Sequence, residues 1–177
     1  MTDVWSAIAE SDAKALSLVI GANAGLVNKP SARGMTPLIL AVQAGYEEIC
    51  SLLLDNGADP NLKANIKSPV SGKMDSSVTA IMFSRSISII DLLVGNGADV
   101  NAVDGNGKTV FLRIASSYDE ILAEKIIELG GVVPKSHLEW LLKIIVEELE
   151  FRKSNGEKSD RVNALQRMAD WCAMRLA

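Results

Sequence analysis

With 177 residues, of which 48% are apolar and 5% aromatic, the chain is long enough to form one domain with a substantial apolar core. Its formal net charge of −4 at pH 7 does not favour a nucleic-acid-binding protein or a membrane-surface protein. No stretch approaches the roughly 18 consecutive apolar residues of a membrane helix. We therefore expect neither a nucleic-acid partner nor a membrane partner.

The N-terminal segment predicts helices without a targeting signal. Residues 1–11 contain Asp3 and Glu10, no basic start and no long apolar run. We therefore expect no signal peptide and a cytoplasmic protein. Residues 5–28 predict a first helical repeat that lacks the Thr-Pro start of the repeat that follows it.

The segment 34–61 is the clearest unit of the chain. It begins with Gly34-Met35-Thr36-Pro37-Leu38 and ends, after a run of leucines, with Gly57-Ala58-Asp59-Pro60-Asn61. Thr36 is expected to cap the first helix with its hydroxyl, and Pro37 suits the first helical position, where no amide donor is needed. Gly57 lies where the second helix should end in a left-handed conformation.

The end of this unit recurs along the chain, since Gly57-Ala58-Asp59 returns as Gly97-Ala98-Asp99. The interval from Asn28 to Asn61 equals the interval from Gly97 to Gly130. That interval is a period of about 33 residues, which with a Thr-Pro start is typical of the ankyrin-repeat family, and the chain resembles this family. The resemblance implies an all-α fold, an ankyrin-repeat solenoid of stacked helix-turn-helix units with hairpin loops. It covers four repeats, at about 3–30, 31–63, 64–103 and 104–134.

The third and fourth repeats depart from the pattern. The interval from Thr79 to Gly97 is shorter than the interval from Thr36 to Gly57, so we expect a shortened first helix or corner in the third repeat. Residues 62–78 contain an insertion, rich in Ser, Gly, Pro and Lys, where the family places a hairpin. The insertion either lengthens one finger for a function or is a tolerated surface insertion. In the fourth repeat, Tyr118 occupies the corner that usually holds glycine.

Residues 135–177 predict two amphipathic helices joined by a turn at 154–158. The apolar residues of each helix are spaced by three and four, as in a helix that buries one face. A solenoid needs a cap at its open end, and we interpret this helical hairpin as that cap, within the same compact unit as 1–134. The alternative is a partner-binding or dimerising hairpin, for which an exposed Trp171 is the expected signature.

The sequence offers little for catalysis. His137 is the single histidine and lies at a helix start, so no Ser/His/Asp or Cys/His arrangement is indicated. Cys50 and Cys172 are far apart in the sequence and are expected to be reduced and buried. We expect no enzyme activity, no cofactor and no metal, because no metal-ligand spacing is present.

The resemblance instead implies protein binding through the concave face and hairpin tips. Mapped onto this sequence, that surface has basic side chains at Arg33, Lys63, Lys67, Lys73, Arg85 and Lys108 and no acidic one. The long finger is expected to add Ile66 and Met74. The candidate partner-binding residues are Arg33, Met35, Gln43, Tyr46, Lys67, Lys73, Met74, Arg85 and Lys108.

A positive face on a negative body should steer an acidic-surfaced protein partner. We therefore expect a non-enzymatic module that acts by occlusion or scaffolding, with a bacterial regulatory or immunity-type protein as one form of this role. The alternative is a structural homo-oligomer assembled through the C-terminal hairpin. A monomer is the expected state, with a homodimer through that hairpin as the other option.

Overall fold

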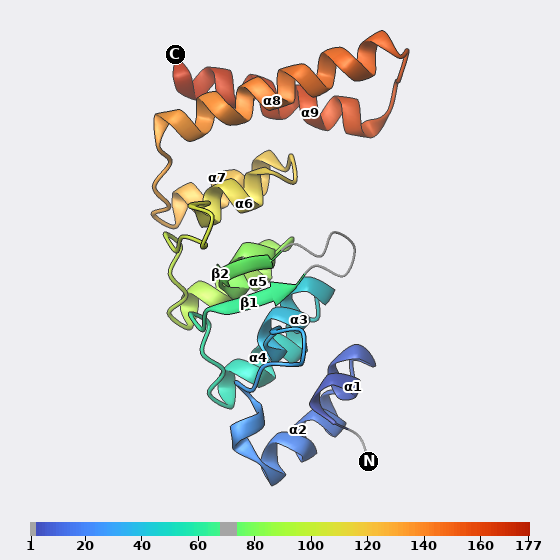
Figure 1. Ribbon diagram of the computed structural model, residues 1–177, viewed down its shortest axis with the longest axis vertical. Coiled ribbons are helices and arrows are strands. Elements are labelled where there is room, and N and C mark those ends of the chain that lie inside the picture. Colours follow the sequence, from blue (N-terminus) through green and yellow to red (C-terminus); the bar gives the residue numbers. More distant parts are fainter. Residues whose placement is uncertain (1–2, 68–73) are drawn as a thin grey trace. The chain divides into compact units, whose positions relative to one another are not determined.

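The computed structural model describes residues 3–67 and 74–177, and it is mostly helical (Figure 1). Contacts within the chain divide it into two compact units, Met1–Val110 and Phe111–Ala177. The sequence favoured one compact unit with the hairpin following residue 134. The division instead falls inside the predicted fourth repeat, because the helices of that repeat contact the C-terminal hairpin directly. The repeat limits themselves stay predictions.

The helices of the first unit come in pairs. In chain order they are α1 (Val4–Ala9), α2 (Ala13–Ala22), the short 3-10 helix η1 (Ala24–Leu26), α3 (Pro37–Ala44), α4 (Glu47–Asp55), the 3-10 helix η2 (Ala80–Phe83) and α5 (Ile87–Gly95). The first helices of the pairs pack in one row, α1 on α3 and α3 on η2. The second helices pack in another row, α2 on α4 and α4 on α5. This is the arrangement expected of stacked helix-turn-helix repeats.

The best-matching repeat begins as its sequence predicts. The Thr36 hydroxyl accepts a hydrogen bond from the Ile39 backbone N–H at 3.2 Å, and Pro37 occupies the first position of α3. The helix ends at Gly45, whose φ of 75° is left-handed. The same corner in the fourth repeat is Tyr118, with a φ of 61°. A tyrosine therefore holds a conformation that costs glycine much less.

The third repeat is shortened in its first helix. Thr79 starts η2, a single 3-10 turn, in place of the two-turn helix that Thr36 starts in the second repeat. The Thr79 side chain caps nothing, and its buried hydroxyl has no hydrogen-bond partner among the described residues. The deletion predicted from the Thr79-to-Gly97 spacing therefore falls in the first helix.

The recurring asparagines tie each repeat to the next. The Asn28 amide donates to the Gly57 carbonyl at 2.9 Å, and its oxygen accepts from the Asp59 N–H at 2.9 Å. Asn61 repeats both bonds one unit later, donating to the Gly97 carbonyl at 2.7 Å and accepting from the Asp99 N–H at 2.8 Å. The periodic asparagine is thus a bridge between the ends of successive second helices.

The insertion forms the strand pair of the first unit. β1 (Ala64–Lys67) and β2 (Met74–Val78) pair antiparallel, with Ala64 opposite Val78 and Lys67 opposite Met74. Burial alternates along β1, with Ala64 and Ile66 buried and the residues after each of them exposed. The lengthened finger predicted for this segment is therefore a β-hairpin, the exception to the expected all-α content.

The second unit contains α6 (Val110–Ala115), α7 (Glu120–Glu128), α8 (Lys135–Ser154) and α9 (Asp160–Leu176). α8 and α9 lie side by side and form the predicted C-terminal hairpin (Figure 1). The buried residues of the two helices are Leu138, Leu141, Ile145, Leu149, Val162, Leu165, Met168, Ala169, Trp171 and Cys172. All but Trp171 lie on the faces that the helical spacing indicates, whereas Leu142 and Leu176 on the same faces are half-buried.

α9 packs on α7 through a second buried side. The Trp171 indole lies 6.1 Å from the Phe111 ring and donates to the Glu124 carboxylate at 3.0 Å. Arg175 pairs with the same carboxylate and stacks on Trp171, 3.9 Å from its ring. Trp171 is therefore 9% exposed, and the exposed signature expected of a partner-binding hairpin is wrong at this residue.

Candidate protein-interaction surface

Predicted binding residues lie on two hairpin tips of the first unit and on the β1–β2 strand pair between them. Arg33 lies on the tip at 31–35, Lys67 and Met74 on the β1–β2 hairpin, and Lys108 on the tip at 104–108. We call these four residues the finger surface. Arg33, Lys67 and Met74 are exposed, and Lys108 is half-buried.

The β1–β2 hairpin is held on both flanks by the neighbouring tips. The Lys67 N–H donates to the Arg33 carbonyl at 3.4 Å, and the Gly105 N–H donates to the Ser76 carbonyl at 2.8 Å. Contact on the first flank is close enough that a Cβ on Gly34 would lie 1.9 Å from the Asn65 carbonyl oxygen. The two tips and the β1–β2 strand pair therefore form one connected row of backbone.

The flanking tips are themselves closed by matching hydrogen bonds. The Ser31 N–H donates to the Met35 carbonyl at 2.8 Å, and the Asp104 N–H donates to the Lys108 carbonyl at 2.9 Å. The buried Asp104 carboxylate also accepts from the Lys108 N–H at 2.9 Å. The carboxylate of this tip is thus turned inward, and it leaves the lysine as the charged group on its surface.

Lys67 and Met74 lie directly opposite each other across the strand pair and are both exposed. Opposed side chains in an antiparallel pair lie on the same face. The hairpin therefore displays an ammonium group beside an apolar side chain, whose exposed fraction is 51%. An apolar contact within a charged rim is the usual composition of a binding surface.

Met35, a further predicted residue, lies on the tip at 31–35 and is half-buried. The remaining predicted residues that the structure describes lie elsewhere in the repeats. Gln43 is in the last turn of α3, Tyr46 precedes α4, and Arg85 lies between η2 and α5, so all three lie at helix-to-helix corners. Arg85 is exposed and donates to the Ser84 carbonyl at 2.9 Å, while Tyr46 is half-buried. Lys73 falls outside the described residues.

Two residues of the inserted finger differ from the expectation. Ile66 was expected on the binding surface, but it is 7% exposed because the β1 alternation turns it toward the core. Asp75, opposite Ile66, is a half-buried acidic residue that the basic count did not include. The positive character of the hairpin therefore comes from its outward face.

A small pocket lies between the first tip and the start of β1. Its volume is about 280 Å³, and its lining residues include Pro30, Gly34, Thr36, Lys63 and Asn65. Lys63 supplies its positive charge. The pocket adjoins the finger surface and is large enough for a partner's side chain.

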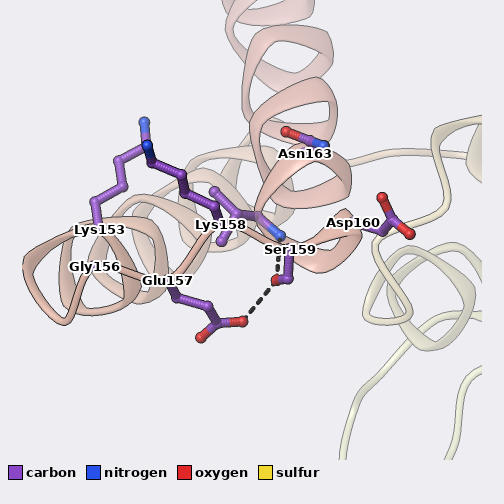
Figure 2. A pocket seen from close by; sticks show the side chains of 8 residues that line it. Lys153, Gly156, Glu157, Lys158, Ser159, Asp160 and Asn163 are labelled. Carbon is purple, nitrogen blue, oxygen red and sulfur yellow. Dashed lines mark hydrogen bonds between the residues drawn. The ribbon is translucent and has the colours of Figure 1, made fainter.

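A larger pocket lies at the α8–α9 turn and has a volume of about 710 Å³ (Figure 2). Its polar groups are used to hold the turn. The Ser159 hydroxyl donates to Glu157 at 2.6 Å, and Lys153 donates to Gln166 at 2.9 Å. Hydrogen bonding from Ser159, followed by pairing with Arg152, lowers the pKa of Glu157. These contacts explain the turn and do not indicate a ligand.

The thiols and the histidine do not form a reactive group. Cys50 and Cys172 are free and buried, as expected, and burial raises their pKa values to about 12 and about 11. Thiols with such pKa values stay protonated and are poor nucleophiles. No hydrogen bond to the buried Nδ1 of His137 is present among the described residues.

Within residues 3–67 and 74–177, no group of three acidic, histidine or cysteine side chains is placed to hold a metal ion. No helix in the same ranges has the length and apolar content needed to cross a membrane.

Comparison with known proteins supports the repeat interpretation. Residues 33–65 match the family model for the ankyrin repeat. The chain is 34% identical over 76 residues to human Ankyrin repeat domain-containing protein 17, a match that covers 43% of this chain and 3% of that protein. It is 30% identical over 97 residues to human Ankyrin repeat and KH domain-containing protein 1, covering 55% and 4%.

A longer match is to Ankyrin repeat domain-containing protein SAT10 of Stachybotrys chartarum, 29% identical over 139 residues. It covers 78% of this chain and 7% of that protein. The chain therefore spans only a small part of the length of these relatives.

Sequence reasoning missed the connection between the two tips and the β1–β2 strand pair. The hydrogen bonds from Lys67 to Arg33 and from Gly105 to Ser76 join backbone atoms, so no pattern of side chains in the sequence predicts them. The signal that was present is Gly34, whose missing side chain leaves room for the Asn65 carbonyl.

Proposed function

Because this chain is an ankyrin-repeat protein, we propose that it binds a protein partner through the finger surface, and that the partner presents an acidic face. Binding would act by occlusion or scaffolding and involves no chemical step by this chain. The corner residues Gln43, Tyr46 and Arg85 would extend the contact along the first-helix row.

One observation carries this proposal: two tips are hydrogen-bonded to the β1–β2 strand pair between them, so that Arg33, Lys67 and Lys108 lie on one connected row of backbone. A surface that is ordered before binding loses less conformational entropy when a partner arrives. Met74 beside Lys67 offers an apolar contact within the charged surface, where binding energy usually concentrates.

Electrostatics favours an acidic partner and predicts a salt dependence. The chain as a whole is negative, with 22 acidic against 18 basic residues, so a general attraction to anions is not expected. A local positive surface acts over about one Debye length, which is about 8 Å at physiological ionic strength. It should raise the association rate more than it slows dissociation.

The test is affinity capture from the source organism's lysate with the native chain and two charge-matched variants. The first variant is Arg33→Glu with Lys67→Glu, on the finger surface. The second is Lys14→Glu with Lys135→Glu, two lysines that lie outside the finger surface, on α2 and at the start of α8. Both variants change the net charge by the same amount, so a general charge effect would appear in both.

We expect a captured protein to be retained by the native chain and by the control variant and lost by the finger variant. Its association rate with the native chain, measured by surface plasmon resonance, should fall about tenfold or more as salt rises from about 50 to about 500 mM. A partner retained by the finger variant would contradict the proposed site. If both variants lose the partner, binding depends on the net charge of the chain and not on the finger surface, and the proposed site is contradicted.

A further inference from the structure

The C-terminal hairpin carries a second apolar face that is not used inside its own unit. Trp140 and Phe151 of α8 are 44% and 65% exposed, although both are large aromatic residues. Ile144 lies between them and is half-buried. This face differs from the side of α8 that holds Leu141, Ile145 and Leu149, residues that are almost completely buried.

The spacing of this face is that of a helix-pairing seam. Trp140, Ile144, Glu147 and Phe151 are separated by four, three and four positions. This is the alternation with which a helix meets a partner helix lengthwise. α8 is 20 residues long, enough for such a seam to run along its outer side. The row is apolar at three of its four positions.

The charged residues in and beside this seam favour a second α8 as the partner helix and favour its antiparallel orientation. Lys143 flanks the N-terminal half, Glu147 lies within the C-terminal half and Glu150 flanks it, and all three side chains are exposed. If a second α8 runs antiparallel, Trp140 of one chain meets Phe151 of the other. Lys143 then faces the acidic pair Glu147 and Glu150. A parallel two-fold arrangement would place Glu147 of one chain directly opposite Glu147 of the other, and this repulsion between like charges opposes pairing.

We propose that this face of α8 is a self-association surface, occupied by α8 of a second copy of the chain in an antiparallel, two-fold symmetric pair. The surface is its own complement, as a two-fold interface requires. The contact is modest, because an aromatic side chain buries about 150–250 Å² when it is fully covered, and here only two per chain contribute. We therefore expect a dimer that forms and dissociates with concentration in the micromolar range.

This inference is independent of the proposed partner binding, because its residues lie on the C-terminal hairpin and the finger surface lies on the first unit. The sequence suggested Trp171 as the sign of a dimerising hairpin, but Trp171 is buried within its own unit. The proposed dimer contact uses Trp140 and Phe151 of α8 instead. The finger variant Arg33→Glu with Lys67→Glu should therefore leave the dimer unchanged.

The test is analytical ultracentrifugation of the full chain and its charge variants from low to high micromolar concentration. The native chain should dimerise. Lys143→Glu and Glu150→Lys should each weaken the dimer at least tenfold, because each places like charges on both sides of the two-fold axis. Mixing these two variants in equal amounts should restore a heterodimer, since each then supplies the charge that the other lacks. Lys14→Glu is the matched control and should dimerise like the native chain.

The apolar row is tested separately by Phe151→Ser, which should abolish the dimer over the whole concentration range. Its control is Leu18→Ser on α2, an exposed apolar residue outside the seam that should leave the dimer intact. Circular dichroism of each variant checks that the helices are kept. A native chain that is monomeric over the whole range would overturn the proposal, and so would a mixture of the two charge variants that stays monomeric.

Discussion

Two threonines at equivalent positions of successive repeats test the role of the helix cap. The same substitution, threonine to valine, is expected to lower the free energy of unfolding at one position and to raise it at the other. Thr36 and Thr79 start successive repeats and are 5% and 1% exposed. The Thr36 hydroxyl caps α3, whereas the Thr79 hydroxyl is buried with no partner among the described residues. Replacing either by valine keeps the branched shape of the side chain and exchanges the hydroxyl for a methyl group.

Thr36→Val should lower the free energy of unfolding by about 1 kcal/mol, the usual effect of removing a helix cap. Thr79→Val should raise it by about 1 kcal/mol, because burying a hydroxyl without a hydrogen bond costs about 1–3 kcal/mol in proteins. Both residues lie in the first compact unit, so the same unfolding transition reports on both.

The measurement is urea unfolding followed by circular dichroism, with the native chain and both variants at one protein concentration. The cap loss and the relief of the buried hydroxyl together predict a difference of about 2 kcal/mol between the variants, with Thr79→Val the more stable. Two variants that lose equal stability would refute the reasoning, because the Thr79 hydroxyl would then be making a stabilising interaction.

Three further predictions concern the asparagine bridge between repeats, the packing of the C-terminal hairpin and the pH dependence of stability. Asn61→Ala removes two hydrogen bonds to the next repeat and should lower the free energy of unfolding by about 1–2 kcal/mol in the same urea assay; an unchanged midpoint would mean that water replaces both bonds. Trp171→Ala should cost about 3–5 kcal/mol, whereas Trp171→Phe loses mainly the bond to Glu124 and should cost much less in thermal unfolding; equal losses would argue against packing as the main term. Burial raises the pKa of Cys50 to about 12, so the folded state holds a proton that the unfolded state releases above pH 9. The stability advantage of the native chain over Cys50→Ala should therefore be complete below pH 9 and shrink by up to about 1.4 kcal/mol per unit as pH rises toward 12. An advantage that stays constant between pH 8 and pH 11 would contradict this sign.

The repeat fold could be predicted because its signals are local. Thr36 and Pro37 define a helix start by their own hydrogen-bonding properties, and Asn61 lies at a fixed distance from the glycine of its own repeat. Each signal depends on neighbours in the sequence, and the structure places each as expected. The finger insertion was also visible as extra residues of turn-forming type.

The parts that could not be predicted depend on contacts between distant segments. The spacing of α9 identifies one apolar face, but Trp171 lies beside that face, and it is buried by contacts with Phe111 of α6 and Glu124 of α7. The burial of Ile66 could not be predicted for a similar reason, since strand register decides which face of β1 is turned inward. A register shift of one residue would exchange Ile66 and Lys67, and composition does not fix that choice.

The hydrogen bonds on both flanks of the β1–β2 hairpin also affect the risk that the inserted strand pair causes aggregation. An open strand edge recruits strands from other molecules and leads to aggregation. Here the tip at 31–35 bonds to the outer side of β1, and the tip at 104–108 bonds to the outer side of β2. The neighbouring repeats thus shield both edges, so a fragment that ends before residue 104 would leave β2 open to intermolecular pairing.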